Sequence, residues 1–229
     1  MGERENILAR IREALTVPAP RPDAAHGPIV NSASPALSEQ EIRTWLPPGG
    51  KTFEESLELF SRNARDLKAE FELVDTADQL LLRVRALMDA EKWTKLATHR
   101  GELTDLVVAK LGLPSCLTDS PYDPKELEQC DVGITQCDAL VAQTGSVLVT
   151  SRSAGGRALS ALPPHHVVLA RRNQLVPDLL AAFAVLKKLY SQSYPSFISF
   201  ITGPSRTGDI ERILVLGAHG PKRLTILCC

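Results

Sequence analysis

The chain has 229 residues, of which 44% are hydrophobic and 23% charged, and its formal net charge is −1. This length suits one large domain or a domain with an appendage, and the composition is that of a protein able to bury a sizeable core. Because there is no basic excess, nothing favours binding to nucleic acid. The first residues are charged, and no apolar run is long enough to span a membrane, so we expect a cytoplasmic protein.

No C-x-x-C pair occurs among the five cysteines, which are Cys116, Cys130, Cys137, Cys228 and Cys229. This spacing gives little support to an iron–sulfur cluster or a structural zinc site. His165 and His166 are adjacent, and neighbouring residues on a strand face opposite sides, so the pair is poorly placed to chelate one metal ion. We therefore expect buried, reduced thiols and no metal or cofactor in this chain.

An amphipathic helix is predicted over residues 4–15, with its apolar residues on one face. Residues 16–50 contain seven prolines and predict a linker, or an arm laid over the surface. The apolar stripe of the helix must be buried either on a partner subunit or on the chain's own domain. The expected organisation is an N-terminal helix and Pro-rich linker over residues 1–50, followed by a packed domain over residues 51–229.

Helix and strand patterns alternate from Lys51 onward. Capping-box patterns at Thr52–Glu55 and Thr76–Gln79 each predict the start of a helix, and Gly112 ends a third helix over residues 103–111. A further helix is predicted from Pro177, with Asp178 in its first turn and Lys187 and Lys188 in its last. Strands are expected at 71–74, 93–97, 130–135, 146–150, 166–170 and 223–229. This order predicts an α/β fold with an open, mostly parallel sheet flanked by helices.

Residues 195–212 combine a strand, a turn and a helix. Aromatic and β-branched residues predict a strand over 195–202, and an apolar i, i+3, i+4, i+7 pattern predicts a helix over residues 210–217. The turn between them starts at Gly203, and a helix N-terminus with Ser205, Arg206 and Thr207 offers donors for a carboxylate or phosphate. The alternative is that Thr207 only caps the helix while Arg206 pairs with Asp209 or Glu211, two carboxylates that also oppose a bound anion.

Three other segments hold candidate site residues. Thr144, Gly145 and Ser146 allow close approach to a ligand, or else Gly145 only makes a tight turn with positive φ. The loop 151–157, with Arg157, and the loop 203–207 each follow a strand, and ligands of open α/β sheets gather at the carboxyl ends of strands; a solvated loop is the alternative for 151–157. His219 either contacts the last carbonyls of a helix or acts as a base oriented by an acidic side chain. Sequence patterns of nucleotide-binding loops and of hydrolase nucleophile elbows are absent.

Two motifs resemble those of a known family. Residues 203–211 (GPSRTGDIE) and 214–221 (LVLGAHGP) resemble the closing signature of the lactate-utilisation (LUD) domain family, and residues 142–146 (AQTGS) with 159–166 resemble its middle signature. The chain's length and layout are similar to those of the lactate utilisation protein C group, and the resemblance covers about residues 51–229. It implies a fold like that of sugar-phosphate isomerases, glucosamine-phosphate deaminases and CoA-transferases. It also implies a part in oxidising L-lactate to pyruvate beside two iron–sulfur partner proteins, with no cluster in this chain.

The sequence departs from the family pattern at two positions. Gln143 stands where a glutamate is expected, and an amide cannot form the acyl intermediate of a CoA-transferase. Gly208 stands where an alanine is expected, which weakens a helix start. The resemblance does not establish whether the chain is itself catalytic.

Three functions are therefore compatible with the sequence. The first is a non-cluster component of lactate utilisation that binds a small carboxylate, a phosphate or a partner. The second is a stand-alone enzyme acting on a phosphorylated or CoA-linked metabolite, and the third is a regulatory or scaffold protein. The candidate binding residues are Thr144, Gly145, Ser146, Arg157, Gly203, Ser205, Arg206, Thr207, Asp209, Glu211 and His219.

Overall fold

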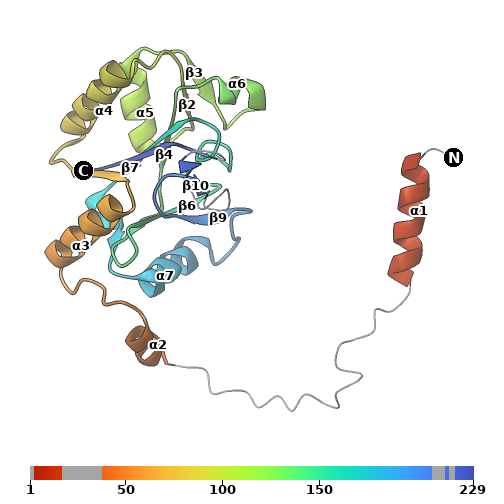
Figure 1. Cartoon of the computed structure of the whole chain (residues 1–229), viewed down its shortest axis with the longest axis horizontal. Coiled ribbons are helices and arrows are strands. Elements are labelled where there is room, and N and C mark those ends of the chain that lie inside the picture. The colour runs from red at the N-terminus through yellow and green to blue at the C-terminus, as the bar shows by residue number, and fades with distance from the viewer. Residues whose placement is uncertain (1–2, 17–37, 208–214, 217–219) are drawn as a thin grey trace. The chain divides into compact units, whose positions relative to one another are not determined.

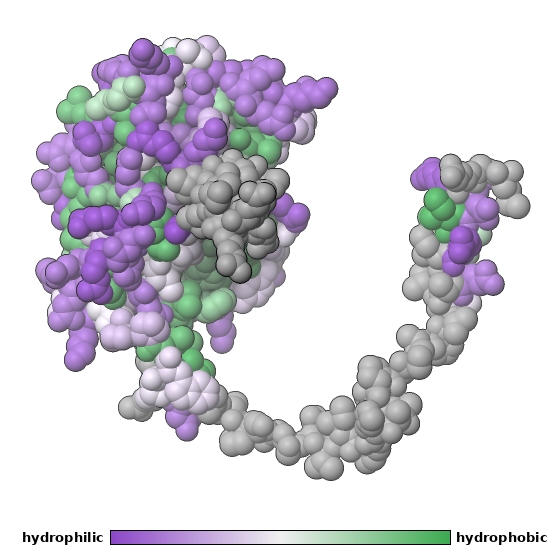
Figure 2. Space-filling model, viewed as in Figure 1, coloured by the Kyte–Doolittle hydropathy of each residue, from purple (hydrophilic) through white to green (hydrophobic). Residues whose placement is uncertain are grey.

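The computed structural model of the chain describes residues 3–16, 38–207, 215–216 and 220–229 (Figure 1). The chain divides into two compact units, residues 1–42 and residues 43–229. None of the described helices is long and apolar enough to cross a membrane. Hydrophilic residues cover most of the visible surface of residues 43–229 (Figure 2).

Helix α1 spans Glu3–Thr16, so the predicted N-terminal helix is confirmed. Helix α2 spans Glu39–Trp45, inside the stretch predicted to be a linker. The backbone N–H of Ser38 donates to Glu41 Oε2 at 2.8 Å, and the N–H of Glu41 donates to Ser38 Oγ at 3.2 Å. This reciprocal Ser-x-x-Glu capping box is the sequence signal for α2 that the count of prolines concealed.

A six-stranded sheet, called here the main sheet, is parallel throughout. The predicted open, mostly parallel sheet is therefore confirmed, although the short strand β3 was missed. Its spatial order is β1 (Glu70–Leu73), β12 (Arg223–Cys228), β7 (His165–Ala170), β4 (Val132–Gln136), β2 (Leu96–Thr98) and β3 (Ser115–Leu117).

One face of the main sheet is covered by α4 (Ala77–Glu91) and α5 (Glu102–Leu111), and the short helix α6 (Pro124–Glu128) connects β3 to β4. Leu80 and Val107 are fully buried against strand residues such as Ile134 and Leu169. Each such side chain stabilises the fold by about 1.5–3 kcal/mol through removal of apolar surface from water. The predicted capping of α4 is confirmed, because the hydroxyl of Thr76 accepts from the N–H of Gln79.

The other face packs on a second sheet of four strands, in the order β8 (Leu175–Val176), β5 (Ala139–Val141), β6 (Ser146–Thr150) and β9 (Ile198–Ile201). Strand β6 is antiparallel to both β5 and β9. The second sheet is itself covered by α7 (Leu179–Tyr190), while α3 (Phe53–Asp66) buries Phe60 and Ala64 in the core between the sheets. The layers are thus α4 and α5, the main sheet, the second sheet and α7, from top to bottom in Figure 1.

Three expectations need correction. Residues 139–141, expected in a loop, form strand β5, which is too short and too completely buried to show alternation. The helix expected over residues 210–217 is wrong at Val215–Leu216, which form strand β11 paired antiparallel with β10 (Arg206–Thr207); residues 208–214 and 217–219 lie outside the described part of the chain. Asp178 is the N-cap of α7 rather than a residue of its first turn, since its Oδ1 accepts from the N–H of Ala181 at 2.8 Å.

Candidate functional site

A cavity of about 170 Å³ lies where the two motifs of the sequence meet in space. We call it the His166 cavity. The middle motif contributes residues 160, 161 and 166, and the closing motif contributes residues 203–205, 220 and 221. Gly203 and Ser205, both predicted as site residues, lie in its wall. Ile201 of β9 and Leu224 of β12 complete it with apolar surface.

His166 is the buried polar residue of this cavity. It lies on β7, its side chain is 1% exposed, and its Nε2 lies 2.8 Å from Thr135 Oγ1 on the neighbouring strand β4. Its Nδ1 has no hydrogen-bond partner among the described residues. Burial, and to a lesser degree the neighbouring His165, lowers the pKa of His166 to about 3, so the ring is neutral at pH 7. Buried polar atoms normally have a hydrogen-bond partner, so an unengaged nitrogen on a ring that lines a cavity points to a ligand as that partner.

His165 faces the opposite side of the main sheet, as predicted. Its ring packs edge-on against Trp93 at 5.4 Å between centroids, and its Nε2 hydrogen-bonds to Thr225 Oγ1 at 2.9 Å. The two histidines therefore cannot hold one metal ion. Among the residues that the structure describes, no group of three or more His, Cys, Asp and Glu side chains is placed to hold one.

The loop that starts at Gly203 is fixed by close packing. Gly203 has φ +84°, and a Cβ atom there would lie 2.6 Å from both Leu67 O and Arg206 Nη2, so another side chain would be strained and crowded. The N–H of Ser205 donates to Pro221 O at 2.9 Å, which ties the two parts of the closing motif together. The cavity wall is thus built by backbone contacts as well as by side chains.

Arg206 does not line the His166 cavity. Its guanidinium donates to Leu67 O at the carboxyl end of α3, where a cation is stabilised by the unpaired carbonyls and the helix dipole. Thr207 lies in strand β10, while Asp209, Glu211 and His219 lie outside the described residues, so their binding roles stay predictions.

Thr144 and Gly145 lie in the turn of the β5–β6 hairpin, and Ser146 is the first residue of β6. Gly145 has φ +64°, which confirms the tight turn, and Asn63 Nδ2 of α3 donates to the carbonyls of residues 142 and 143. Ser146 Oγ hydrogen-bonds to Thr202 Oγ1 at 2.8 Å, so this turn lies beside the segment that enters the cavity loop. Thr144 Oγ1 is buried without a partner among the residues described. The ligand role of these three residues stays a prediction.

Arg157 lies at the other end of the second sheet. The antiparallel register of β6 and β9 pairs Val147 with Ile201 and Thr150 with Ile198, so the loops after these strands are at opposite ends. Arg157 Nη2 donates to Ser196 O at 3.1 Å, and its guanidinium lies over the ring of Phe197. Both loops do follow strands, but β6 and β9 lie in the second sheet and run antiparallel, so the two loops are not brought together.

Gln143 has a packing role. It is 8% exposed, its side-chain nitrogen donates to Pro47 O, and its Oε1 accepts from the N–H of Leu179 at 3.4 Å. This amide is held by the main chain on both sides, which agrees with the sequence argument against a covalent transferase mechanism.

The four buried cysteines are poor nucleophiles in this fold, because burial raises the pKa of each thiol. These four are buried as predicted, and Cys229 is half-buried. Burial raises the pKa of Cys130 to about 11 and that of Cys228 to about 12, so these thiols stay protonated at pH 7.

Sequence reasoning missed His166 and Ser160 as site residues. Both residues lie within the middle motif, so the sequence contained a signal for them. The two histidines were considered only as possible metal ligands. Only the packing of β9 and the closing motif onto β7 shows that these residues face the same cavity as Ser205.

Comparison with known proteins gives relatives of similar sequence and fold. Lactate utilization protein C of Geobacillus sp. (strain WCH70) is 38% identical over 102 residues, which is 44% of this chain and 42% of that protein. The protein of the same name from Bacillus subtilis (strain 168) is 36% identical over 99 residues, 42% and 41% of the two chains. The matched stretch thus spans about two fifths of the length of these curated relatives.

A solved structure and a family model extend the comparison. The crystal structure of a DUF162 family protein from Deinococcus radiodurans has a TM-score of 0.63 at 21% identity, covers 78% of this chain and 99% of that chain, and shows the same fold. The LUD domain model matches residues 57–228, which is more than half of the sequence. With the fold, the motifs and this match in agreement, the chain belongs to the LUD domain family.

Proposed function

We propose that this chain is a component of a lactate-utilisation system and that the His166 cavity binds a small carboxylate. The observation that carries the proposal is the convergence of both family motifs on one cavity with a buried, unengaged histidine nitrogen. Relatives named lactate utilization protein C support the pathway. The resemblance further supports two iron–sulfur proteins as partners in the cytoplasm, with residues 51–229 as the working domain and residues 1–50 as its appendage.

The size of the cavity suits a three-carbon acid. An engineered cavity of about 150 Å³ binds benzene, a molecule of about six non-hydrogen atoms. The His166 cavity has a volume of about 170 Å³, and L-lactate and pyruvate each contain the same number of non-hydrogen atoms as benzene. Phosphorylated sugars and CoA esters are too large for it. This argues against the alternative function, an enzyme that binds such a metabolite in this cavity.

The chemistry of the wall suits the hydroxyl end of lactate. His166 and the hydroxyls of Ser160 and Ser205 supply hydrogen-bonding groups, and Ile201 and Leu224 supply apolar surface for a methyl group. No cationic side chain is found among the described residues of the wall, and complete burial of an unpaired carboxylate is costly. The carboxylate is therefore expected to remain in contact with water, with a dissociation constant on the order of millimolar.

Titration of the full chain with L-lactate, followed by NMR or calorimetry, tests this site. L-lactate should bind more tightly than propionate, which has the same carbon skeleton without the hydroxyl. His166→Gln should weaken L-lactate binding at least tenfold, because it removes the ring that lines the cavity and carries the unengaged nitrogen. His165→Gln is the matched control, being equally buried on the same strand but on the opposite face, and should leave the affinity unchanged.

Equal binding of lactate by wild type and His166→Gln, with both variants folded by circular dichroism, would refute the assignment of this cavity. The pathway is tested separately in the host organism. Deleting the gene should abolish growth on L-lactate and leave growth on pyruvate intact, and the chain should co-purify with iron–sulfur proteins. Normal growth of the deletion strain on L-lactate would remove the pathway assignment whatever the cavity binds.

A further inference from the structure

A second cavity, of about 450 Å³, lies at the carboxyl ends of β2, β4 and β7. We call it the carboxyl-end crevice. Its volume falls within the roughly 300–1,000 Å³ typical of small-molecule sites. It shares no described lining residue with the His166 cavity, whose main-sheet residues, His166 and Leu224, lie near the amino ends of β7 and β12.

The crevice lies where the winding of the main sheet reverses. From β2 the chain continues through α5 on one face to the outer strand β3. From β4 it crosses to the second sheet on the other face and returns to β7, on the opposite side of β4 from β2. The segments that leave β2 and β4 therefore diverge, and such a switch point is where open α/β sheets bind ligands. Residues 102, 103, 136 and 138 contribute to the crevice from these two segments.

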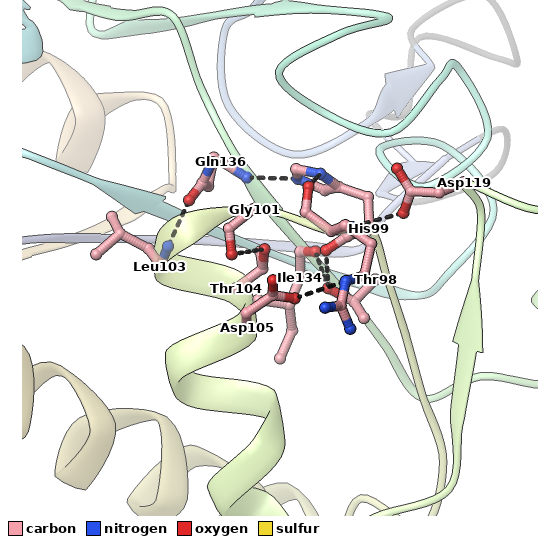
Figure 3. A network of polar contacts seen from close by, with 10 residues as sticks. Thr98, His99, Gly101, Leu103, Thr104, Asp105, Asp119, Ile134 and Gln136 are labelled. Carbon is pink, nitrogen blue, oxygen red and sulfur yellow. Dashed lines mark hydrogen bonds and ion pairs between the residues drawn. The ribbon is translucent and has the colours of Figure 1, made fainter.

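Gln136 lines this crevice, and its hydrogen bonds to Leu103 and His99 are shown in Figure 3. Its Oε1 accepts from the N–H of Leu103 at the start of α5 at 2.6 Å, which orients the amide. Its backbone N–H donates to His99 Nε2 at 3.1 Å, and His99 Nδ1 donates to Arg100 O at 2.9 Å, so the strand end is held on both sides. The side-chain nitrogen Nε2 has no hydrogen-bond partner in the described part of the chain and is left to contact a ligand.

The acidic groups of the crevice are already engaged. Glu102 forms an ion pair with Arg171. Asp138, 8% exposed, accepts from Tyr190 Oη and from Ser153 Oγ, each at 2.6 Å.

The free groups are mostly donors. Lys188 of α7 has no ion pair among the residues described, and its ammonium joins the Gln136 amide in the lining of the crevice. A ligand that satisfies these groups must be rich in acceptors, as a carboxylate or a phosphate is.

Besides the polar Asn173 and Gln174, the remaining wall contains apolar side chains. Val176 of β8 and Val185 and Leu189 of α7 line it, and Leu189 is 54% exposed. We propose that the carboxyl-end crevice binds an organic anion, whose carboxylate or phosphate contacts Gln136 and Lys188 and whose apolar body packs on Val185 and Leu189. Its volume is well over twice that of the His166 cavity, so its ligand is larger than a three-carbon acid.

Three probes of similar body and different head group test the proposal: benzoate, phenyl phosphate and benzyl alcohol. Each is titrated into the full chain while the side-chain amide signals are followed by NMR. One or both anions should shift the Gln136 amide signal and bind at least tenfold more tightly than neutral benzyl alcohol. Binding of benzoate alone assigns a carboxylate ligand, and binding of phenyl phosphate alone assigns a phosphate ester.

Two substitutions sharpen the test. Gln136→Glu keeps an acceptor for the N–H of Leu103 but replaces the free donor by a negative oxygen, so it should weaken anion binding at least tenfold without unfolding the chain. Lys188→Gln should weaken it several-fold. The control is Lys187→Gln, which removes a charge from the neighbouring position of α7 outside the crevice and should have no effect.

The proposal is overturned if neither anion binds or if benzyl alcohol binds as tightly as the anions. It is also overturned if Lys187→Gln and Lys188→Gln weaken binding equally, because the effect is then one of general surface charge. The test is independent of lactate binding, so its failure leaves the His166 cavity untouched.

Discussion

Gly145 is the residue at which the β5–β6 hairpin touches helix α3. A Cβ atom there would lie 2.8 Å from the backbone N of Ala64 and from the backbone C of Asn63, and φ is +64°. Gly145→Ala therefore adds a clash with helix backbone to the strain of a left-handed conformation. We expect it to lower the free energy of unfolding by about 3 kcal/mol or more, measured by urea denaturation.

Gly112→Ala provides the control for the strain alone. Gly112 has φ +71°, but a Cβ atom there would meet nothing within 4 Å. It should lower the free energy of unfolding by about 1–2 kcal/mol. Equal losses in the two variants would show that the hairpin moves away from α3 without cost and that the close approach is unimportant.

Residues of the candidate site could be predicted from the sequence only where hydrogen-bonding side chains lie in a turn that the local sequence also predicts. Gly203 and Ser205, which line the His166 cavity, were predicted as site residues because a glycine-led turn follows a strand. His166 was not assigned, because its role depends on Leu224 and Gly220, which lie more than 50 residues away in the chain. The contact of Arg206 with Leu67 spans 139 residues and leaves no local trace either.

The N-cap residue Asp178 stabilises helix α7 in addition to the burial of its apolar face. Asp178 is 3% exposed and accepts from the N–H of Ala181. Asp178→Ala should lower the free energy of unfolding by at least about 1 kcal/mol, since the partly buried N–H of Ala181 loses its acceptor.

Asp178→Asn keeps a capping oxygen and serves as the control, because asparagine is as good an N-cap as aspartate. Urea denaturation of both variants makes the comparison. If Asp178→Asn destabilises the chain as much as Asp178→Ala, the charge of Asp178 matters rather than its hydrogen bond to α7.

Most helices could be predicted from local signals in the sequence. The division of the strands between two sheets could not. Capping residues such as Thr52 and Thr76 satisfy N–H groups of their own first turns, so the information lies within four residues. Strand β6 reads as a buried β-run in either sheet. Its antiparallel pairing with β9 depends on contacts between positions about 50 residues apart, such as Val147 with Ile201.

The stability of residues 43–229 should depend on pH through buried, neutral histidines. Burial is the main cause that lowers the pKa of His165 to about 4 and that of His166 to about 3, from an ordinary value near 6.5. As the pH falls below 6.5 the unfolded chain gains protons that the folded chain does not, so the folded state loses stability until the pH reaches these lowered values. Each histidine contributes a slope of up to about 1.4 kcal/mol per pH unit.

Urea denaturation at pH 7.5, 6.0 and 5.0 measures this dependence. For the two histidines together we expect a loss of up to about 3 kcal/mol per pH unit between pH 6 and pH 5. His165→Gln should reduce the dependence of the free energy of unfolding on pH by the contribution of one histidine. A free energy of unfolding that stays constant from pH 7.5 to 5.0 would contradict the neutral, buried state of both rings.

Strand β12 lies in the interior of the main sheet, between β1 and β7, although it follows all the other strands of that sheet in the chain. On the ribosome, a nascent chain therefore lacks the strand that lies between β1 and β7 until residues 223–228 have emerged. Until then the edges of β1 and β7 that pair with β12 stay open, in addition to the outer edges of the sheet, and open edges favour pairing with other chains. Translation that stops before Arg223 would leave a product prone to aggregation rather than a slightly shortened protein.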